Sequence, residues 1–219
     1  MSWSQVKSSD RSYSSPVRAE QAELTKRRIT DAAYELFLER GYPATTVAEI
    51  AKAAGVTGQT VYNTFGSKPA LLKRVYDIRL VGDEAPIPLA QRPDFIAMYQ
   101  QEDPVRFLEG YAQLGRELMD RLGPLLLVVL AGAQAGDSDL AAHIDTTNGE
   151  RLIGTGMAAN RVNALNALRP GLTVERARDL IWTLNSVEVW HLLTGLRGWS
   201  SDEYAEWLGK AMCGAVLGR

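Results

Sequence analysis

Apolar residues recur at intervals of three and four along most of the chain, which is the spacing of amphipathic helices. The first such stripe consists of Ile29, Ala32, Ala33, Leu36 and Phe37. The stripe predicts a helix that begins at Ser15-Pro16, because proline is tolerated in the first turn of a helix. We expect this helix to end at Gly41, since glycine commonly closes a helix in the left-handed conformation.

Two short helices are predicted on either side of Gly55. Thr46 and Glu49 have the spacing of a capping box, in which the side chain of each satisfies a backbone N–H near the start of the first helix. Thr57 is placed to cap the second helix. Two helices joined by a turn of a few residues form the helix-turn-helix pattern.

The second of these helices, residues 58–65, has the side chains expected of a DNA-reading helix. Val61 and Phe65 are predicted to face the core, which leaves the polar residues outside. Gln59 and Asn63 can pair with the N6/N7 edge of adenine in the major groove. Since this helix has no Lys or Arg, phosphate contacts must come from Lys68, Lys52 or the first helix. The predicted DNA contacts are Thr45, Thr46, Thr57, Gly58, Gln59, Thr60, Tyr62, Asn63 and Lys68.

A further helix is predicted at residues 68–81, and proline-rich sequence with several acidic residues follows from Gly82 to Pro104. This change of composition suggests a boundary between modules. The predicted organisation is a flexible N-terminal arm at 1–17, a helix-turn-helix domain at 18–82 and a second domain at 83–219.

The second domain is also predicted to be helical. Its helices are expected at 104–122, 125–135, 137–168 and 173–193, with a last helix capped by Ser200 and Glu203. Gly123-Pro124 is expected to separate the first two. The helix at 173–193 carries two apolar stripes, which suggests a packing partner on each side. The first stripe is Ala177, Leu180, Ile181, Leu184 and Val187, and the second is Trp182, Val189, Leu193 and Leu196.

The distribution of charge along the chain is more informative about function than the net charge. The 219 residues have a formal net charge of -2. Residues 18–82 hold 10 Lys/Arg and 7 Asp/Glu, whereas residues 83–219 hold 12 and 18. A basic front on an acidic body is consistent with a DNA-binding module attached to another domain.

Cysteine usage and apolar runs indicate the class of protein. The single Cys213 cannot form an internal disulfide, which favours a reducing cytoplasm. No apolar run is long enough to cross a membrane, and the N-terminus lacks the apolar core of a secretory signal.

No catalytic residues, metal ligands or cofactors are predicted. Phosphate-binding glycine loops, nucleophile motifs and Cys/His metal spacings are absent from the sequence. The two histidines, His143 and His191, are interpreted as surface or core residues.

Residues 25–80 resemble the DNA-binding domain of the TetR (tetracycline-repressor-like) family of transcriptional regulators. The matching residues are Gly41-Tyr42, Thr45 to Ala51, Ala54-Gly55-Val56, Thr60-Val61-Tyr62, Phe65 to Lys68 and Leu71-Leu72. The chain departs from the family at Thr64, where His is common, and at Pro69, where an acidic residue is frequent. Each departure could remove a phosphate or capping contact.

The resemblance implies an all-α protein with an N-terminal three-helix helix-turn-helix domain and a C-terminal helical domain for ligand binding and dimerisation. It implies a homodimer through the last two helices, bound to a double-stranded DNA operator and controlled by a small-molecule effector. The expected ligand contacts are Phe107, Tyr111, Leu114, Leu130, Gln134, Met157, Trp182, Asn185, Ser186 and Val189.

Three functions stay open at this point. The favoured one is a repressor released from a palindromic operator by a small, largely apolar ligand. The second is a DNA-binding regulator without such a ligand, controlled by a protein partner or by its expression level. The third is an enzyme with a vestigial helix-turn-helix, against which the lack of a catalytic constellation argues.

Overall fold

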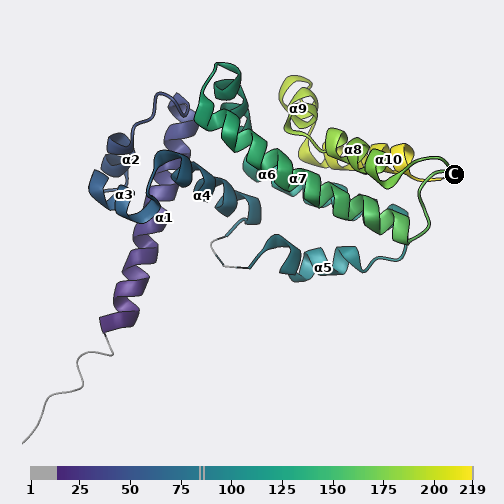
Figure 1. The fold of residues 1–219 in the computed structure, drawn as a ribbon, viewed down its shortest axis with the longest axis horizontal. Helices are drawn as coiled ribbons and strands as arrows, with labels where there is room; N and C mark the ends of the chain where they lie inside the picture. Colours follow the sequence, from purple (N-terminus) through teal and green to yellow (C-terminus); the bar gives the residue numbers. More distant parts are fainter. Residues whose placement is uncertain (1–13, 84, 86, 219) are drawn as a thin grey trace, which may run out of the picture. The chain divides into compact units, whose positions relative to one another are not determined.

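The computed structural model describes residues 14–83, 85 and 87–218, and side chains from residue 18 onward within that range. Its regular structure is helical, which confirms the all-α prediction, and the only pairing of strand type among the described residues is an isolated bridge between Leu168 and Leu217 (Figure 1). The helices form two compact units, one ending at Val75 and the other beginning at Tyr76. The arm predicted at 1–17 lies mostly outside the described residues.

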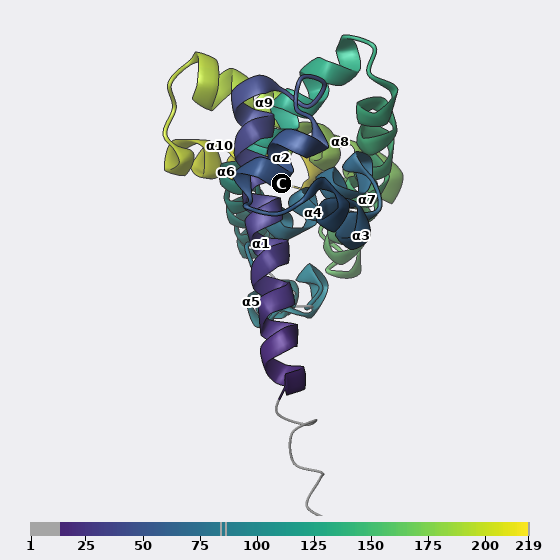
Figure 2. The same ribbon diagram turned by 90° about the vertical axis from the view of Figure 1, so that its left-hand side faces the viewer.

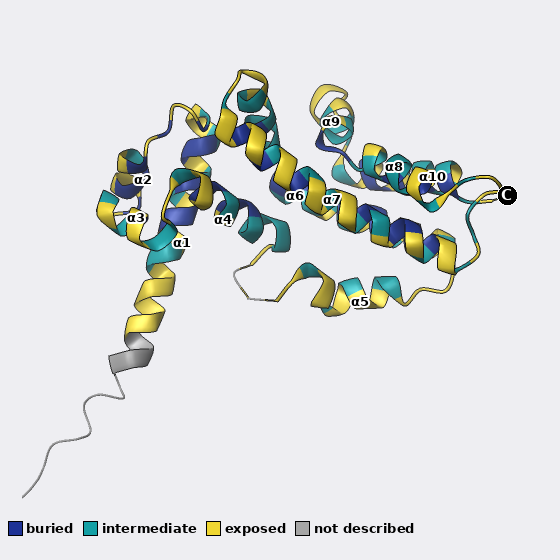
Figure 3. Ribbon diagram, in the orientation of Figure 1, coloured by how far each residue is buried: buried dark blue, intermediate teal, exposed yellow. Residues whose placement is uncertain are grey.

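Unit 1 contains α1 (Ser14–Arg40), α2 (Val47–Ala53), α3 (Gly58–Phe65) and the first half of α4 (Lys68–Val81). α2 packs on α1 and α3 packs on α2 (Figures 1 and 2). Residues 18–24 of α1 are exposed, whereas its second half buries the predicted stripe (Figure 3). The main buried side chains are Ile29, Ala33, Leu36, Phe37, Tyr42, Ile50, Ala51, Val61, Leu71, Leu72 and Val75.

The local signals in unit 1 are confirmed. Thr46 and Glu49 form the capping box at the start of α2, and Thr57 caps α3 by accepting a hydrogen bond from the Thr60 N–H. Gly41 and Gly55 both have positive φ, at +79° and +66°, a region that L side chains rarely adopt. Sequence therefore sets the ends of these helices residue by residue.

Unit 2 contains the second half of α4 and all later elements. These are η1 (Leu89–Gln91), α5 (Pro93–Tyr99), α6 (Pro104–Gln134), α7 (Ser138–Ala164), α8 (Val174–Leu184), α9 (Val187–Trp190), the π-helical η2 (His191–Leu196) and α10 (Ser201–Val216). α6 lies against α7 and α10, and α8 packs on α7 and α10. Their shared core includes Phe107, Leu108, Ala158, Val162, Ile181, Tyr204, Leu208 and Met212.

The predicted break at Gly123-Pro124 is wrong, because α6 continues through both residues to Gln134. Leu122 and Leu125 are buried on either side, so packing holds the helix although Pro124 contributes no N–H to it. Gly123 has a different role from ending the helix. A Cβ atom there would lie 2.5 Å from carbons of the Trp190 ring, so the missing side chain lets that ring approach α6.

The single helix predicted at 173–193 is also wrong. α8 ends at Leu184 with Asn185 as its C-cap, and Ser186 starts α9 by accepting a hydrogen bond from the Val189 N–H. A serine hydroxyl competes well for the backbone at such positions, whereas Ser186 was predicted as a ligand contact within one continuous helix. The second stripe is therefore divided among α8, α9 and η2.

The division between the units falls inside α4, whereas the change of composition predicted a domain boundary at 82/83; packing does not test that boundary, which stays a prediction. No helix in the described part of the chain is long and apolar enough to cross a membrane.

Candidate nucleic-acid interface and C-terminal cavity

The outer side of α3 is polar and uncharged. Gln59, Tyr62 and Asn63 are exposed, whereas Val61 is buried beneath them. The Gln59 side chain donates a hydrogen bond from Nε2 to Asn63 Oδ1 at 2.8 Å. These two amides, one helical turn apart, therefore form a pre-paired polar edge on the helix.

The threonines at the ends of these helices are engaged within unit 1. Thr45 is 1% exposed, and its hydroxyl donates to the carbonyls of Leu36 and Gly41. The Thr46 hydroxyl belongs to the capping box, and the hydroxyls of Thr57 and Thr60 lie 2.8 Å apart. A base or phosphate contact by the Thr45 side chain would require its release from the core. The role of all these residues at DNA stays a prediction.

Lys68 has a structural role that sequence alone did not suggest. Its ammonium donates a hydrogen bond to the Tyr42 carbonyl at 2.6 Å and lies 4.0 Å from the centre of the Tyr42 ring. This contact joins the start of α4 to the segment that follows α1. A phosphate bound by Lys68 would share the ammonium with these two partners.

We expect Lys68→Met to destabilise unit 1 by about 1–3 kcal/mol, because it removes a charge-assisted hydrogen bond but keeps a long apolar stem. Hydrogen exchange of the amides in α3 and α4 measures the change. Lys52→Met is the matched control, since Lys52 is an exposed residue of α2, and it should change stability by less than about 0.5 kcal/mol. Equal losses in the two variants would contradict a special role for the Tyr42 contact.

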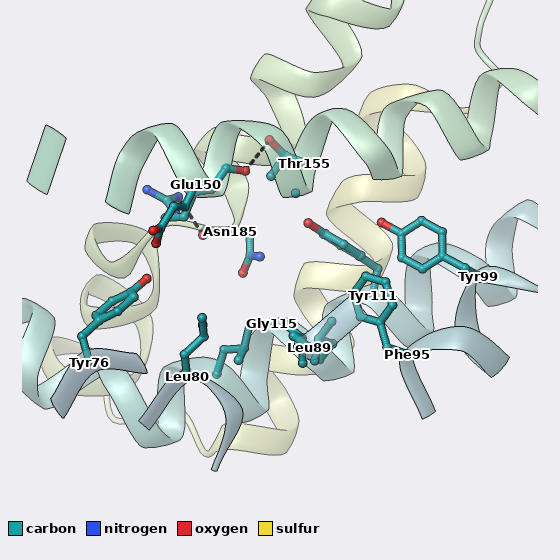
Figure 4. Close-up of a pocket in the computed structure, with 14 residues that line it drawn as sticks. Tyr76, Leu80, Leu89, Phe95, Tyr99, Tyr111, Gly115, Glu150, Thr155 and Asn185 are labelled. Atoms are coloured by element: carbon teal, nitrogen blue, oxygen red, sulfur yellow. Dashed lines mark hydrogen bonds between the residues drawn. The ribbon is translucent and has the colours of Figure 1, made fainter. Parts of the chain in front are cut away.

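Unit 2 contains a partly open cavity of about 150 Å³ (Figure 4). Its walls come from the second half of α4, from η1, α5, α6 and α7, and from the residue that ends α8. The lining residues are Tyr76, Leu80, Leu89, Phe95, Tyr99, Tyr111, Leu114, Gly115, Leu118, Glu150, Arg151, Gly154, Thr155 and Asn185.

Aromatic rings form one side of this cavity. Phe95 and Tyr99 are stacked with ring centres 4.6 Å apart, and Phe107 meets Tyr99 edge-on at 5.2 Å. Burial raises the pKa of Tyr111 to about 12 and also raises that of Tyr99. Both phenols are therefore neutral over the physiological range of pH.

Arg151 supplies the main cationic group at the cavity. Its Nη2 atom donates to the carbonyls of Trp182 and Asn185, both at 2.9 Å, and Nη1 donates to the side chain of Asn148. The guanidinium carbon lies 4.7 Å from the centre of the Trp182 ring. Burial lowers the pKa of Arg151. The side chain thus caps the C-terminal end of α8, where carbonyl groups lack helical partners.

Three of the ten predicted ligand contacts, Tyr111, Leu114 and Asn185, line the cavity. Phe107 is fully buried behind it, and Leu130 lines a smaller hollow of about 80 Å³. The cavity lining does not include Gln134, Met157, Trp182, Ser186 or Val189. Met157 is 42% exposed, and Ser186 caps α9. Binding by any of the ten stays a prediction.

Sequence reasoning missed the part of the cavity made by α4, η1 and α5. Tyr76 and Leu80 were assigned to the DNA-binding module. Leu89 was assigned to a loop region, and Phe95 to a short helix expected within it at about 94–100, which α5 confirms. Arg151 lies in the helix predicted at 137–168, but no role was predicted for it. The sequence does show that Arg151 is a basic residue in a region of apolar helices. Its position at the C-terminal end of α8, however, is set by the packing of α7 on α8.

The buried histidine of α7 is a packing residue in this fold. His143 meets the Tyr76 ring edge-on with ring centres 5.3 Å apart. Among the described residues, no three His, Cys, Asp or Glu side chains gather closely enough to hold a metal ion.

Residues 29–75 match the family model for bacterial regulatory proteins of the tetR family. Among curated proteins, the chain is 40% identical over 76 residues to the HTH-type transcriptional regulator TtgW of Pseudomonas putida, covering 35% of this chain and 54% of TtgW. It is 28% identical over 160 residues to the HTH-type regulator YdeS of Bacillus subtilis, covering 72% and 74% of the two chains. The matches to TtgW and to AlkX of Mycobacterium tuberculosis span about half and about a quarter of those relatives.

Solved structures share the fold over most of the chain. NalD, described as the secondary repressor of the MexAB-OprM multidrug efflux pump in Pseudomonas aeruginosa, aligns with a TM-score of 0.69 and 22% identity, covering 90% of this chain and 98% of NalD. A complex of SmeT with triclosan aligns with a TM-score of 0.67 and 18% identity, covering 88% and 91%. At these identities the likeness concerns the fold alone.

Proposed function

We propose that this chain, which belongs to the TetR family of transcriptional regulators, is a homodimeric repressor that leaves a palindromic operator when a small, largely apolar compound enters the unit 2 cavity. The family carries DNA binding through the helix-turn-helix. Repression, the homodimer and the effector are the proposed parts. As a DNA-binding regulator, it would act in the cytoplasm.

The single observation that carries this proposal is the exposed face of α3. Gln59 and Asn63 present amides that suit the major-groove edge of adenine, on a helix held in place by its buried Val61. In a two-fold dimer, two such helices read half-sites one helical turn apart, about 34–36 Å. We assign the pairing of the subunits to α8 and α10, the last two regular helices apart from the short α9.

α4 offers a physical route from the cavity to unit 1. Tyr76 and Leu80 line the cavity, and the same continuous helix begins at Lys68 in unit 1. A compound that favours one position of Tyr76 and Leu80 therefore favours one position of α4. The effect on DNA affinity equals the difference in affinity of the compound for the two conformations.

The cavity favours this reading over a regulator without a small-molecule ligand. Apolar and aromatic residues surround the space, and a few polar groups converge on it, as in small-molecule sites. SmeT has been solved with triclosan and NalD is described as a repressor, which makes both properties reasonable for a protein of this fold. Control by a protein partner remains the second candidate if the cavity proves unable to bind a compound.

Selection of DNA from a random library by the full-length chain tests the proposal. We expect enrichment of a palindrome whose half-sites are one helical turn apart, bound by two or more subunits in sedimentation. Enrichment of a single asymmetric half-site by a monomer, or no enrichment, would overturn it.

A further inference from the structure

We infer that the unit 2 cavity takes a compound with one aromatic ring and one neutral hydrogen-bond donor, such as a phenol, and that Asn185 Oδ1 accepts that hydrogen bond. The inference rests on the proposed function for the compound's role as effector. The binding itself depends only on the cavity.

The volume of the cavity corresponds to about one ring. A space of about 150 Å³ is comparable to engineered protein cavities that bind benzene. Leu114 and Leu118 from α6, with Leu80 and Leu89 from α4 and η1, supply its aliphatic wall. A charged or strongly hydrated compound would lose its water there without recovering enough hydrogen bonds.

The opposite wall suits a flat ring. Phe95 and Tyr99 are stacked, and Tyr111 continues the aromatic side past Phe107. Aromatic rings pack well edge-to-face or in offset stacks at these spacings. A bound ring would therefore extend an existing aromatic row.

Two lining groups are buried without a hydrogen-bond partner among the described residues, the Tyr99 hydroxyl and the Asn185 Oδ1 atom, and only Asn185 Oδ1 can act as an acceptor alone. The Asn185 amide points into the cavity (Figure 4). A Cβ atom at Gly115 would lie only 2.6 Å from Oδ1, so the amide lies directly against α6. The N–H groups of that helix are already used in helical hydrogen bonds. A molecule in the cavity, either water or a bound compound, is therefore the available donor.

The charges around the cavity favour a neutral donor over an anion. Arg151 already donates from both terminal nitrogens to Asn148, Trp182 and Asn185. Glu150, an exposed residue, also lines the cavity. A carboxylate on the compound would meet a carboxylate and the Asn185 oxygen, with the guanidinium engaged elsewhere.

The test compares three probes, phenol, toluene and benzoate, by calorimetric titration into the full-length protein. Phenol and toluene have the same number of heavy atoms and differ in the donor. We expect wild type to bind phenol roughly tenfold more tightly than toluene, as one hydrogen bond in a buried site implies, and benzoate most weakly. Asn185→Leu should bind the two neutral probes about equally. Asn163→Leu, at an exposed position of α7, is the matched control and should keep the preference.

Every other result overturns the inference. Failure of wild type to bind any probe excludes a one-ring compound, tighter binding of benzoate excludes the neutral donor, and a phenol preference that survives in Asn185→Leu excludes Asn185 as acceptor. A melting temperature of Asn185→Leu close to wild type, with toluene binding retained, shows that the variant is folded. If the probes bind as expected but never release selected DNA, the proposed function fails and the ligand class stands. If another compound class releases DNA while phenol does not bind, the inferred ligand class fails and the proposed function stands.

Discussion

Replacing both Gln59 and Asn63 with alanine should remove most of the sequence preference of DNA binding. Each amide that pairs with two atoms of an adenine contributes about 1–3 kcal/mol of discrimination. We expect the double variant to lose about 2–4 kcal/mol, roughly 30- to 700-fold, in the ratio of operator to random DNA affinity. Non-specific binding should change little, because α3 carries no Lys or Arg and phosphate contacts come from elsewhere.

The hydrogen bond between the two amides makes the single variants informative. In the free protein Gln59 donates to Asn63, so the two side chains are coupled before either of them meets a base. Alanine at one position frees the other amide, and the two single effects should not add up to the double effect. The four proteins of this double-mutant cycle should be measured at one salt concentration.

Fluorescence anisotropy with the selected operator and a scrambled duplex gives the ratio of specific to non-specific DNA affinity. Gln113→Ala combined with Asn163→Ala is the matched control, since it removes the same two side-chain types from exposed positions of unit 2. An unchanged ratio in the Gln59/Asn63 variant would remove α3 from base recognition. The dimer should persist in both double variants.

Phe107→Ala should destabilise unit 2 by about 3–5 kcal/mol. Phe107 is completely buried in the shared core of α6, α7, α8 and α10, and its ring lies between those of Tyr99 and Tyr111. Truncation removes the transfer free energy of the ring and leaves a space that helices cannot easily close. The variant should also enlarge the neighbouring cavity and admit compounds larger than one ring.

Urea-induced unfolding, monitored by tryptophan fluorescence, measures this loss in the free energy of unfolding. Trp182, Trp190, Trp199 and Trp207 all lie in unit 2, and the remaining Trp3 lies outside the described residues. Phe95→Ala is the matched control, because its ring is only half-buried and lines the cavity from α5. It should cost less than about 2 kcal/mol. A loss below about 1 kcal/mol in Phe107→Ala would show that the core can collapse around the missing ring.

The reliability of sequence reasoning differed between the two units for a physical reason. In unit 1, caps and glycines lie next to the helices they end, so α3 and α4 could be predicted with their observed bounds. In unit 2 the same local signals had to be weighed against packing. Gly123-Pro124 was predicted to end a helix, but α6 continues through it and Gly123 makes room for the Trp190 ring. Ser186 was predicted to lie within one helix as a ligand contact, but it caps α9.

The lining of the candidate cavity could be predicted only where its residues lie on the apolar stripe of a single helix. Tyr111 and Leu114 follow from the period of α6, but Tyr76 and Arg151 reach the cavity from helices far apart in sequence. Periodicity identifies the side of a helix that is buried. It does not identify which buried sides leave space between them.

The continuity of α4 bears on the construction of hybrid regulators, in which the sensor of one protein is joined to the DNA reader of another. A fusion at Val75/Tyr76, where packing separates the units, would cut a helix whose later residues line the cavity and receive Arg121 hydrogen bonds at the carbonyls of Arg79 and Leu80. A junction at Gly82, which has a φ of +85° at the end of α4, would leave the helix intact. It would, however, take Tyr76, Leu80 and the carbonyls that Arg121 contacts from the DNA-reading parent, and Arg121 from the sensor parent. A hybrid should therefore take the whole of α4 from the sensor parent. Otherwise, Tyr76 and Leu80 should be replaced by the residues that occupy these positions in the sensor parent.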